Sequence, residues 1–296
     1  MRRLIFGSVG SSVSYLFIVA GCLQSFIRGD DLLSGANSGN DFGCQPDDDK
    51  HCIAERRARL FDRIYETGFW TGTDASASTS GVGSSAANAT AAATALSEVI
   101  RTFRIKSVLD LGCGDQTWLQ GVDWPLDLRY VGVDISSVLI ERLRAKPSRR
   151  NNTEYFQMDA VEQVIESPAF DLILVRDVIG HLPLHSSVQL LRNVQSMRPK
   201  FLLAKTFLRT DANQRSYRLA HGELVNLFKP PFCLSDPLRL FHDDFFDAYL
   251  GLWKVAGSPA ALVPTVNTHM VNYGLDDACS RTMQQHSEIN ASFHSS

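Results

Sequence analysis

The stretch Val108-Leu109-Asp110-Leu111-Gly112-Cys113-Gly114-Asp115 decides the fold of this chain. It reads as a short buried strand that runs directly into an acidic turn with two glycines. In open parallel sheets, ligands bind outside the carboxyl ends of the strands, where glycine lets the backbone approach the ligand and the next helix offers free N–H groups. The stretch therefore predicts a strand followed by a binding site for a nucleotide-like ligand.

Two well-known nucleotide motifs do not fit the residues after this turn. A dinucleotide fingerprint needs a third small residue at position 117, but the chain has Thr117 followed by the bulky Trp118. A phosphate-binding P-loop is also missing, because no Gly-Lys-Ser/Thr follows the turn. A nicotinamide oxidoreductase is therefore a less favoured alternative.

Short apolar runs alternate with helix-length or polar segments after residue 104. The runs are 107–111, 130–133, 155–157, 170–175 and 201–205. This alternation predicts a parallel sheet with helices on both faces. Two later segments, 237–242 and 249–255, fit an antiparallel pair at the edge of the sheet. We expect an α/β fold with a doubly wound, Rossmann-like, seven-stranded sheet that is mostly parallel.

The segment before the first strand predicts two helices joined by a loop. Apolar residues recur at helical spacing over 47–67, and Gly68 ends the pattern. Residues 70–85 are a Gly/Ser/Thr-rich loop, and a second apolar stripe follows through Leu96, Val99, Ile100 and Phe103. We interpret 47–104 as a helical arm, whose loop is either a linker or a cover over the ligand site.

The chain ends differ in composition from the domain over 47–256. A run of 24 uncharged residues, 4–27, has the length of a membrane-spanning helix, so 1–28 predicts a signal anchor or a signal peptide. The polar residues 29–46 predict a flexible stem, and 257–296 a loosely ordered tail.

Charge flanking this run predicts its orientation. Arg2 and Arg3 outnumber Arg28, so the N-terminus stays cytoplasmic and the body crosses into a secretory lumen. Three sequons, at Asn88, Asn151 and Asn290, are compatible with a glycoprotein. Two alternatives stay open: 19–22 resembles a bacterial lipoprotein box, and the Ser-rich, acid-free start fits an organelle transit peptide.

Composition excludes two kinds of partner. The chain of 296 residues has 29 Lys and Arg against 32 Asp and Glu, a net charge of −3, and therefore lacks the basic footprint of non-specific nucleic-acid binding. Its six cysteines show no zinc-binding spacing. His181 and His185 are spaced as HxxxH, but Pro183 between them disturbs a regular helix. We expect no metal.

Acidic residues end two further predicted strands. Asp134 follows the run 130–133, where a carboxylate can accept both hydroxyls of a ribose. Asp159 follows the run 155–157 and can accept an adenine amino group. Because the carboxyl ends of parallel strands meet at one edge, these two acids and the glycine turn should form one cleft.

Four fragments in order resemble the class I S-adenosylmethionine-dependent methyltransferases: DLGCGD, YVGVDIS, FQMDA and FDLILVRDVIGHL. The resemblance covers residues 104–205, within a little-characterised branch that also carries NLFKPPF at 226–232. It implies S-adenosylmethionine as the cofactor. It also implies a set of cofactor-binding residues: Asp110, Gly112, Gly114, Asp134, Asp159, Ala160 and Arg176.

The same resemblance places two residues beside the reacting atoms. Asp177, just past the fourth strand, would face the sulfonium and the substrate. His181 is the candidate base, because imidazole titrates near neutrality and the residue follows that strand at the cleft. A second interpretation stays open for His181, in which it only orients the loop through a backbone carbonyl.

These observations favour an enzyme that transfers a methyl group to a small-molecule or glycan acceptor. The expected lumenal location motivates the glycan. The main alternative is a catalytically inactive binding or scaffold protein of the same fold, which the acids at 110, 134 and 159 argue against.

Overall fold

The computed structural model describes residues 50–71, 78–146, 152–165, 169–213, 219–220, 222–243 and 245–256. The chain divides into two units, 1–56 and 57–296. The described part of the first unit is the beginning of helix α2, and the sheet and both cavities lie in the second. The helices are α2 (Lys50–Thr67), α3 (Thr90–Thr102), α4 (Ser137–Ala145) and α5 (Leu184–Ser196), with short 3-10 turns η1 (Val82–Ser84), η2 (Trp118–Gly121), η3 (Ile179–His181) and η4 (Phe245–Asp247).

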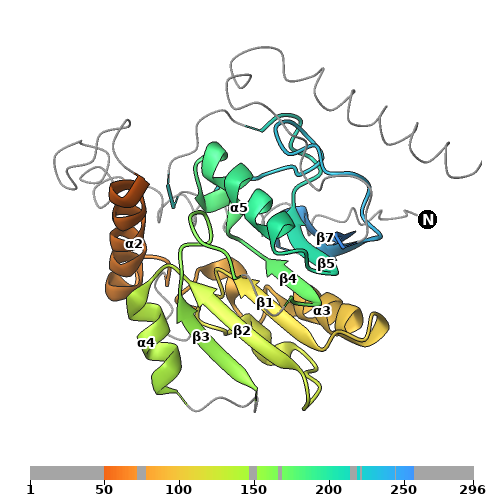
Figure 1. Ribbon diagram of the computed structural model, residues 1–296, viewed down its shortest axis with the longest axis horizontal. Coiled ribbons are helices and arrows are strands. Elements are labelled where there is room, and N and C mark those ends of the chain that lie inside the picture. The colour runs from red at the N-terminus through yellow and green to blue at the C-terminus, as the bar shows by residue number, and fades with distance from the viewer. Residues whose placement is uncertain are drawn as a thin grey trace, which may run out of the picture. The chain divides into compact units, whose positions relative to one another are not determined.

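Seven strands form one sheet in the order β3-β2-β1-β4-β5-β7-β6 (Figure 1). The strands are β1 (Ser107–Leu111), β2 (Arg129–Asp134), β3 (Thr153–Gln157), β4 (Leu172–Val175), β5 (Phe201–Thr206), β6 (Arg239–Asp243) and β7 (Ala248–Lys254). The first five run parallel, whereas β7 pairs antiparallel with both β5 and β6. The predicted α/β sheet with an antiparallel edge pair is confirmed.

The order of the strands determines where a ligand can sit. The chain moves outward from β1 through β2 to β3 and then returns to β4 on the other side of β1. This reversal is a topological switch point, and the crevice outside the strand ends there is the usual ligand site of open α/β sheets. The glycine turn at the end of β1 lies at that point.

Helices cover both faces of the sheet, as predicted (Figure 1). Buried residues of α5 and of 225–234 pack on one face against the inward side chains of β1, β2, β4 and β5. The apolar stripe of α3 packs on the opposite face, where Leu96 and Val99 are fully buried. The two layers hold the strand ends rigidly, so side chains there are presented from a fixed frame.

Strand β4 begins at Leu172, two residues later than the apolar run suggested. The reason is Asp171, whose carboxylate accepts the backbone N–H groups of Lys106 at 2.6 Å and Ser107 at 3.2 Å. Its side chain thus caps the start of β1. Other predicted boundaries agree with the structure or shift by at most three residues.

The predicted signal segment, stem and tail, together with Asn151 and Asn290, lie outside the described residues. Within the part of the chain that is described, no helix is long and apolar enough to cross a membrane. Asn88 precedes α3, and its side-chain amide donates to the carbonyl of Val82 at 2.9 Å.

Candidate active site

The turn after β1 needs glycine at both of its glycine positions. Gly112 has φ +69 and Gly114 has φ +58, in the left-handed region that favours glycine. A Cβ on Gly112 would lie 2.4 Å from a methyl of Val178, and one on Gly114 would lie 2.7 Å from Oγ of Ser80. The backbone of this turn therefore forms a cradle that faces the cavity. It can do so only because neither glycine carries a side chain.

The Gly/Ser/Thr-rich loop of the arm is bonded onto this turn. The Asp115 carboxylate accepts the backbone N–H of Thr79 at 2.6 Å and the hydroxyl of Ser78 at 3.0 Å. In return, the N–H of Asp115 donates to Oγ of Ser80 at 2.8 Å, and this oxygen lies 3.1 Å from the Tyr65 hydroxyl. The described part of the loop thus covers the ligand site, which was one of the two interpretations left open.

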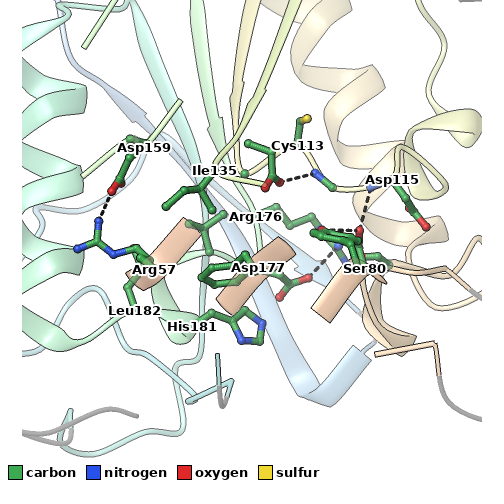
Figure 2. A pocket seen from close by; sticks show the side chains of 18 of the residues that line it. Arg57, Ser80, Cys113, Asp115, Ile135, Asp159, Arg176, Asp177, His181 and Leu182 are labelled. Atoms are coloured by element: carbon green, nitrogen blue, oxygen red, sulfur yellow. Dashed lines mark hydrogen bonds and ion pairs between the residues drawn. The ribbon is translucent and has the colours of Figure 1, made fainter. Parts of the chain in front are cut away.

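Helix α2 also contributes to the site. Asp62 accepts the Ser136 hydroxyl at 2.7 Å and the N–H of Val138 at 3.2 Å, so it ties α2 to the start of α4. Arg57 forms an ion pair with Asp159 at the end of β3 (Figure 2). No motif in the sequence signals Arg57, because the residues it joins are far apart along the chain.

Asp134 is buried at the end of β2. Its carboxylate accepts the N–H of Ser136 at 3.0 Å and that of Gly114 at 3.2 Å. Burial raises the pKa of Asp134 to about 6, although these backbone hydrogen bonds oppose the shift. The carboxylate lines the cavity, and each of its oxygens can accept a further hydrogen bond from a ligand.

Asp159 lines the same cavity, but both of its oxygens already have partners. One accepts the N–H of Val161 at 2.9 Å, and the other pairs with Arg57. Asp159 therefore holds α2 against the pocket in addition to the adenine-binding role expected of it.

Asp110 is not among the residues that line the cavity. Its carboxylate is buried beneath the glycine turn and accepts the Tyr130 hydroxyl at 2.6 Å. The resemblance implied that Asp110 binds the cofactor, and from this position we expect it to act on the ligand through the turn.

Four charged side chains form a cluster after β4, in which Arg176, Lys205 and Asp243 are buried and Asp177 is partly exposed. Asp177 pairs with Lys205 at 2.8 Å and with Arg176 at 2.9 Å, and both cations also lie 3.4 Å from Asp243. Burial by itself raises the pKa of Asp177, but Lys205 and Arg176 outweigh it and hold this pKa well below its usual range. Asp177 is thus ionised throughout the physiological range.

Arg176 contacts more than this cluster. Its guanidinium donates to the carbonyl of Gly83 at 2.9 Å and lies 4.8 Å from the centre of the Trp118 ring. It therefore connects the arm loop to the sheet, and only part of it faces the cavity.

His181 ends η3, directly after β4. The centroid of its ring lies 5.0 Å from the centroid of the Trp70 ring, and one edge of the imidazole lies next to Gly222. Its backbone carbonyl accepts the N–H of Ala220 at 2.8 Å. The imidazole is thus held between the arm and the segment that precedes residue 225.

These elements enclose a cavity of about 800 Å³ that opens to solvent. Figure 2 shows its charged and polar side chains converging from the strand ends and from α2. Eight of the nine predicted site residues line it: Gly112, Gly114, Asp134, Asp159, Ala160, Arg176, Asp177 and His181. Its other lining residues were not predicted as site residues, and they include Arg57, Phe61, Tyr65 and Asp115.

A second cavity of about 870 Å³ adjoins the first. The two share six lining residues: Trp70, Ser80, Ser84, Asp177, Val178 and His181. Within the described residues, no group of three or more His, Cys, Asp and Glu side chains is arranged to hold a metal ion.

Residues 108–198 match the family described as methyltransferase domain. Among solved structures, magnesium protoporphyrin IX methyltransferase from Synechocystis PCC 6803 with bound SAH shares 11% identity over 69% of this chain and 98% of that chain, with a TM-score of 0.44. The N-methyltransferase NodS from Bradyrhizobium japonicum WM9, in complex with S-adenosyl-L-homocysteine, shares 14% identity over 55% and 84% of the two chains, with a TM-score of 0.41. No curated protein matches the chain.

The matched residues contain the glycine turn, the acids that end β2 and β3, and the Arg-Asp-containing segment after β4. Residues 108–198 therefore match a methyltransferase domain, and they lie within a seven-stranded α/β sheet.

Proposed function

We propose that the first cavity holds S-adenosylmethionine and that the second admits a small-molecule acceptor of the methyl group. Bound there, the cofactor supplies a methyl group already activated by positively charged sulfur. The glycine cradle and the buried Asp134 carboxylate fit this cofactor, because both offer a ligand polar backbone or carboxylate atoms at a switch point. Gly112 and Gly114 would face its methionine part, Asp134 its ribose and Asp159 its adenine.

The observation that carries this proposal is the junction of the two cavities. Asp177 and His181 line both, so a group bound in one meets a group bound in the other beside these two side chains. Positioning two reactants in this way supplies much of the acceleration of a displacement reaction.

The side chains at the junction have separate tasks. His181 accepts the proton of the acceptor as the methyl group arrives. Asp177 remains ionised and balances the charges of the buried cations Lys205 and Arg176. The net charge of these side chains, where the two cavities meet, therefore stays constant. The indole of Trp70 packs on the imidazole and limits its orientation.

An inactive scaffold is the competing function, and cofactor binding separates the two. Isothermal titration calorimetry of the full chain with S-adenosylmethionine and S-adenosylhomocysteine should show one site that binds both. Incubation with methyl-labelled cofactor and fractionated metabolites, lipids and glycans should then label one pool. A folded protein that binds neither nucleoside contradicts the proposal, and one that binds both but labels nothing favours the scaffold.

We also propose that the body of the chain resides in an oxidising, secretory compartment behind an N-terminal membrane tether. The uncharged run 4–27 supports the tether. In sealed vesicles, the body should resist added protease until detergent opens the membrane. Digestion of the body before detergent is added contradicts this topology.

A further inference from the structure

The second cavity has a strongly aromatic wall. Trp70, Phe207, Phe245 and Phe246 all line it, together with Leu224 and Val82. Three of these stand at the surface with large exposed fractions: Phe246 at 44%, Leu224 at 49% and Val82 at 46%. Apolar side chains exposed around the mouth of a cavity mark a ligand-binding site for an apolar molecule.

Phe246 also has a strained backbone. Its φ of 58 and ψ of 28 place a bulky residue in the left-handed region. Such strain persists only where the surrounding structure enforces it, and it clusters at ligand sites. The two adjacent rings, Phe245 and Phe246, pack edge to face with centroids 4.3 Å apart, so they present flat surfaces at the mouth.

The charged side chains of the cluster beside this cavity are paired with one another. Lys205 and Arg176 are the buried cations, and Asp177 and Asp243 are the matching anions. Of these four, Lys205 and Asp177 line the cavity, and the other titratable side chains that line it are Glu223 and His181. An anionic acceptor would lose its hydration in this aromatic pocket and would meet Lys205 only as a cation already paired with Asp177 and Asp243.

A cation nevertheless lies where an acceptor oxygen would develop negative charge. The Lys205 ammonium is 5.5 Å from the centre of the Phe207 ring and 5.6 Å from that of Phe245. Lys205 and His181 both line this cavity, so a ring-bound oxygen held in it can approach these two side chains. A nearby positive charge stabilises an oxyanion as it forms.

We propose that the acceptor is a neutral, flat aromatic molecule whose ring-bound hydroxyl is the methylated group. This rests on the proposed function and specifies its acceptor as a phenol rather than a glycan. The hydroxyl proton goes to His181, and the oxygen forms a bond to the methyl carbon. The carbon–sulfur bond of the donor breaks with its electron pair on sulfur, so the products are an aryl methyl ether, neutral S-adenosylhomocysteine and protonated His181.

Calorimetry on the full chain saturated with S-adenosylhomocysteine tests this without turnover. The probes are 2-naphthol, its anionic analogue 2-naphthalenesulfonate, the cationic 2-naphthylmethylammonium and methyl β-glucoside as a sugar. We expect 2-naphthol to bind and the other three to bind at least about tenfold more weakly. Phe246→Ala and Phe207→Ala should each weaken 2-naphthol binding about 3- to 10-fold, because each removes an aromatic contact.

Phe156→Ala is the matched control. Phe156 is also 44% exposed but lies on β3, outside both cavities, so its removal should leave 2-naphthol binding unchanged. Tighter binding of the glucoside or of a charged probe overturns the proposal, and so does 2-naphthol binding that neither Phe variant weakens. If S-adenosylhomocysteine binds and 2-naphthol does not, the phenol acceptor is wrong while the methyltransferase function stands. Failure to bind S-adenosylhomocysteine removes both.

Discussion

His181→Ala should lower kcat by about 10²- to 10⁴-fold while S-adenosylhomocysteine binds with nearly normal affinity. The size of this loss is the usual contribution of a positioned general base. The pH profile of kcat should lose its acidic limb in the variant, because that limb reports protonation of the imidazole. Rates must be measured at saturating cofactor and acceptor, so that the separate titration of Asp134 does not contribute.

His185→Ala is the matched histidine control. His185 lies on α5 outside both cavities, and its replacement should leave kcat unchanged. If His181 only orients its loop, the His181→Ala enzyme should instead bind cofactor and acceptor more weakly and retain the acidic limb. Near-normal turnover of a folded His181→Ala protein would end its assignment as the base.

Asp134→Ala should weaken the binding of S-adenosylhomocysteine by roughly 10²- to 10⁴-fold. The carboxylate is expected to accept two hydrogen bonds from the ribose, and each bond to a charged group contributes roughly 1.5 to 3 kcal/mol. Calorimetry measures the affinity, and thermal unfolding verifies that the variant folds. Unchanged affinity in a folded protein removes Asp134 from the cofactor site.

The pH dependence gives Asp134 a second signature. Its pKa of about 6 in the folded protein exceeds the ordinary value for aspartate, so below pH 6 the side chain is protonated and loses acceptor capacity. Affinity for S-adenosylhomocysteine should be constant above that pH and fall about tenfold per pH unit below it. The stability of the free protein depends on pH in the opposite direction. It increases as the pH falls through 6, because the neutral form of the Asp134 side chain tolerates burial better than the ionised form. Asp134→Ala should abolish both dependences.

Local patterns of apolar, glycine and acidic residues predicted much of the architecture. The apolar runs located the buried strands because a buried strand must be apolar along most of its length, and the acidic-glycine turn identified the end of β1. The segments of β3 and β6 were also predicted, although most of their side chains are not buried. The mostly parallel sheet followed from the alternation of strands and helices, whereas the order of the strands came from the structure. Eight of the nine predicted site residues line the first cavity, because a parallel sheet brings the carboxyl ends of its strands together at one edge.

The sequence by itself therefore determined the class of fold, the edge of the sheet that carries the site and the identity of Asp134 and the two glycines within it. Tertiary structure alone decided the rest. Arg57 meets Asp159 from 102 residues away, and Lys205 meets Asp177 across two strands. Such contacts leave no trace in local periodicity, because a charged residue on a helix or at a strand end looks the same whether it faces solvent or a buried partner. Only packing of the arm and the edge strands against the sheet brings these charges together and leaves an aromatic cavity beside them.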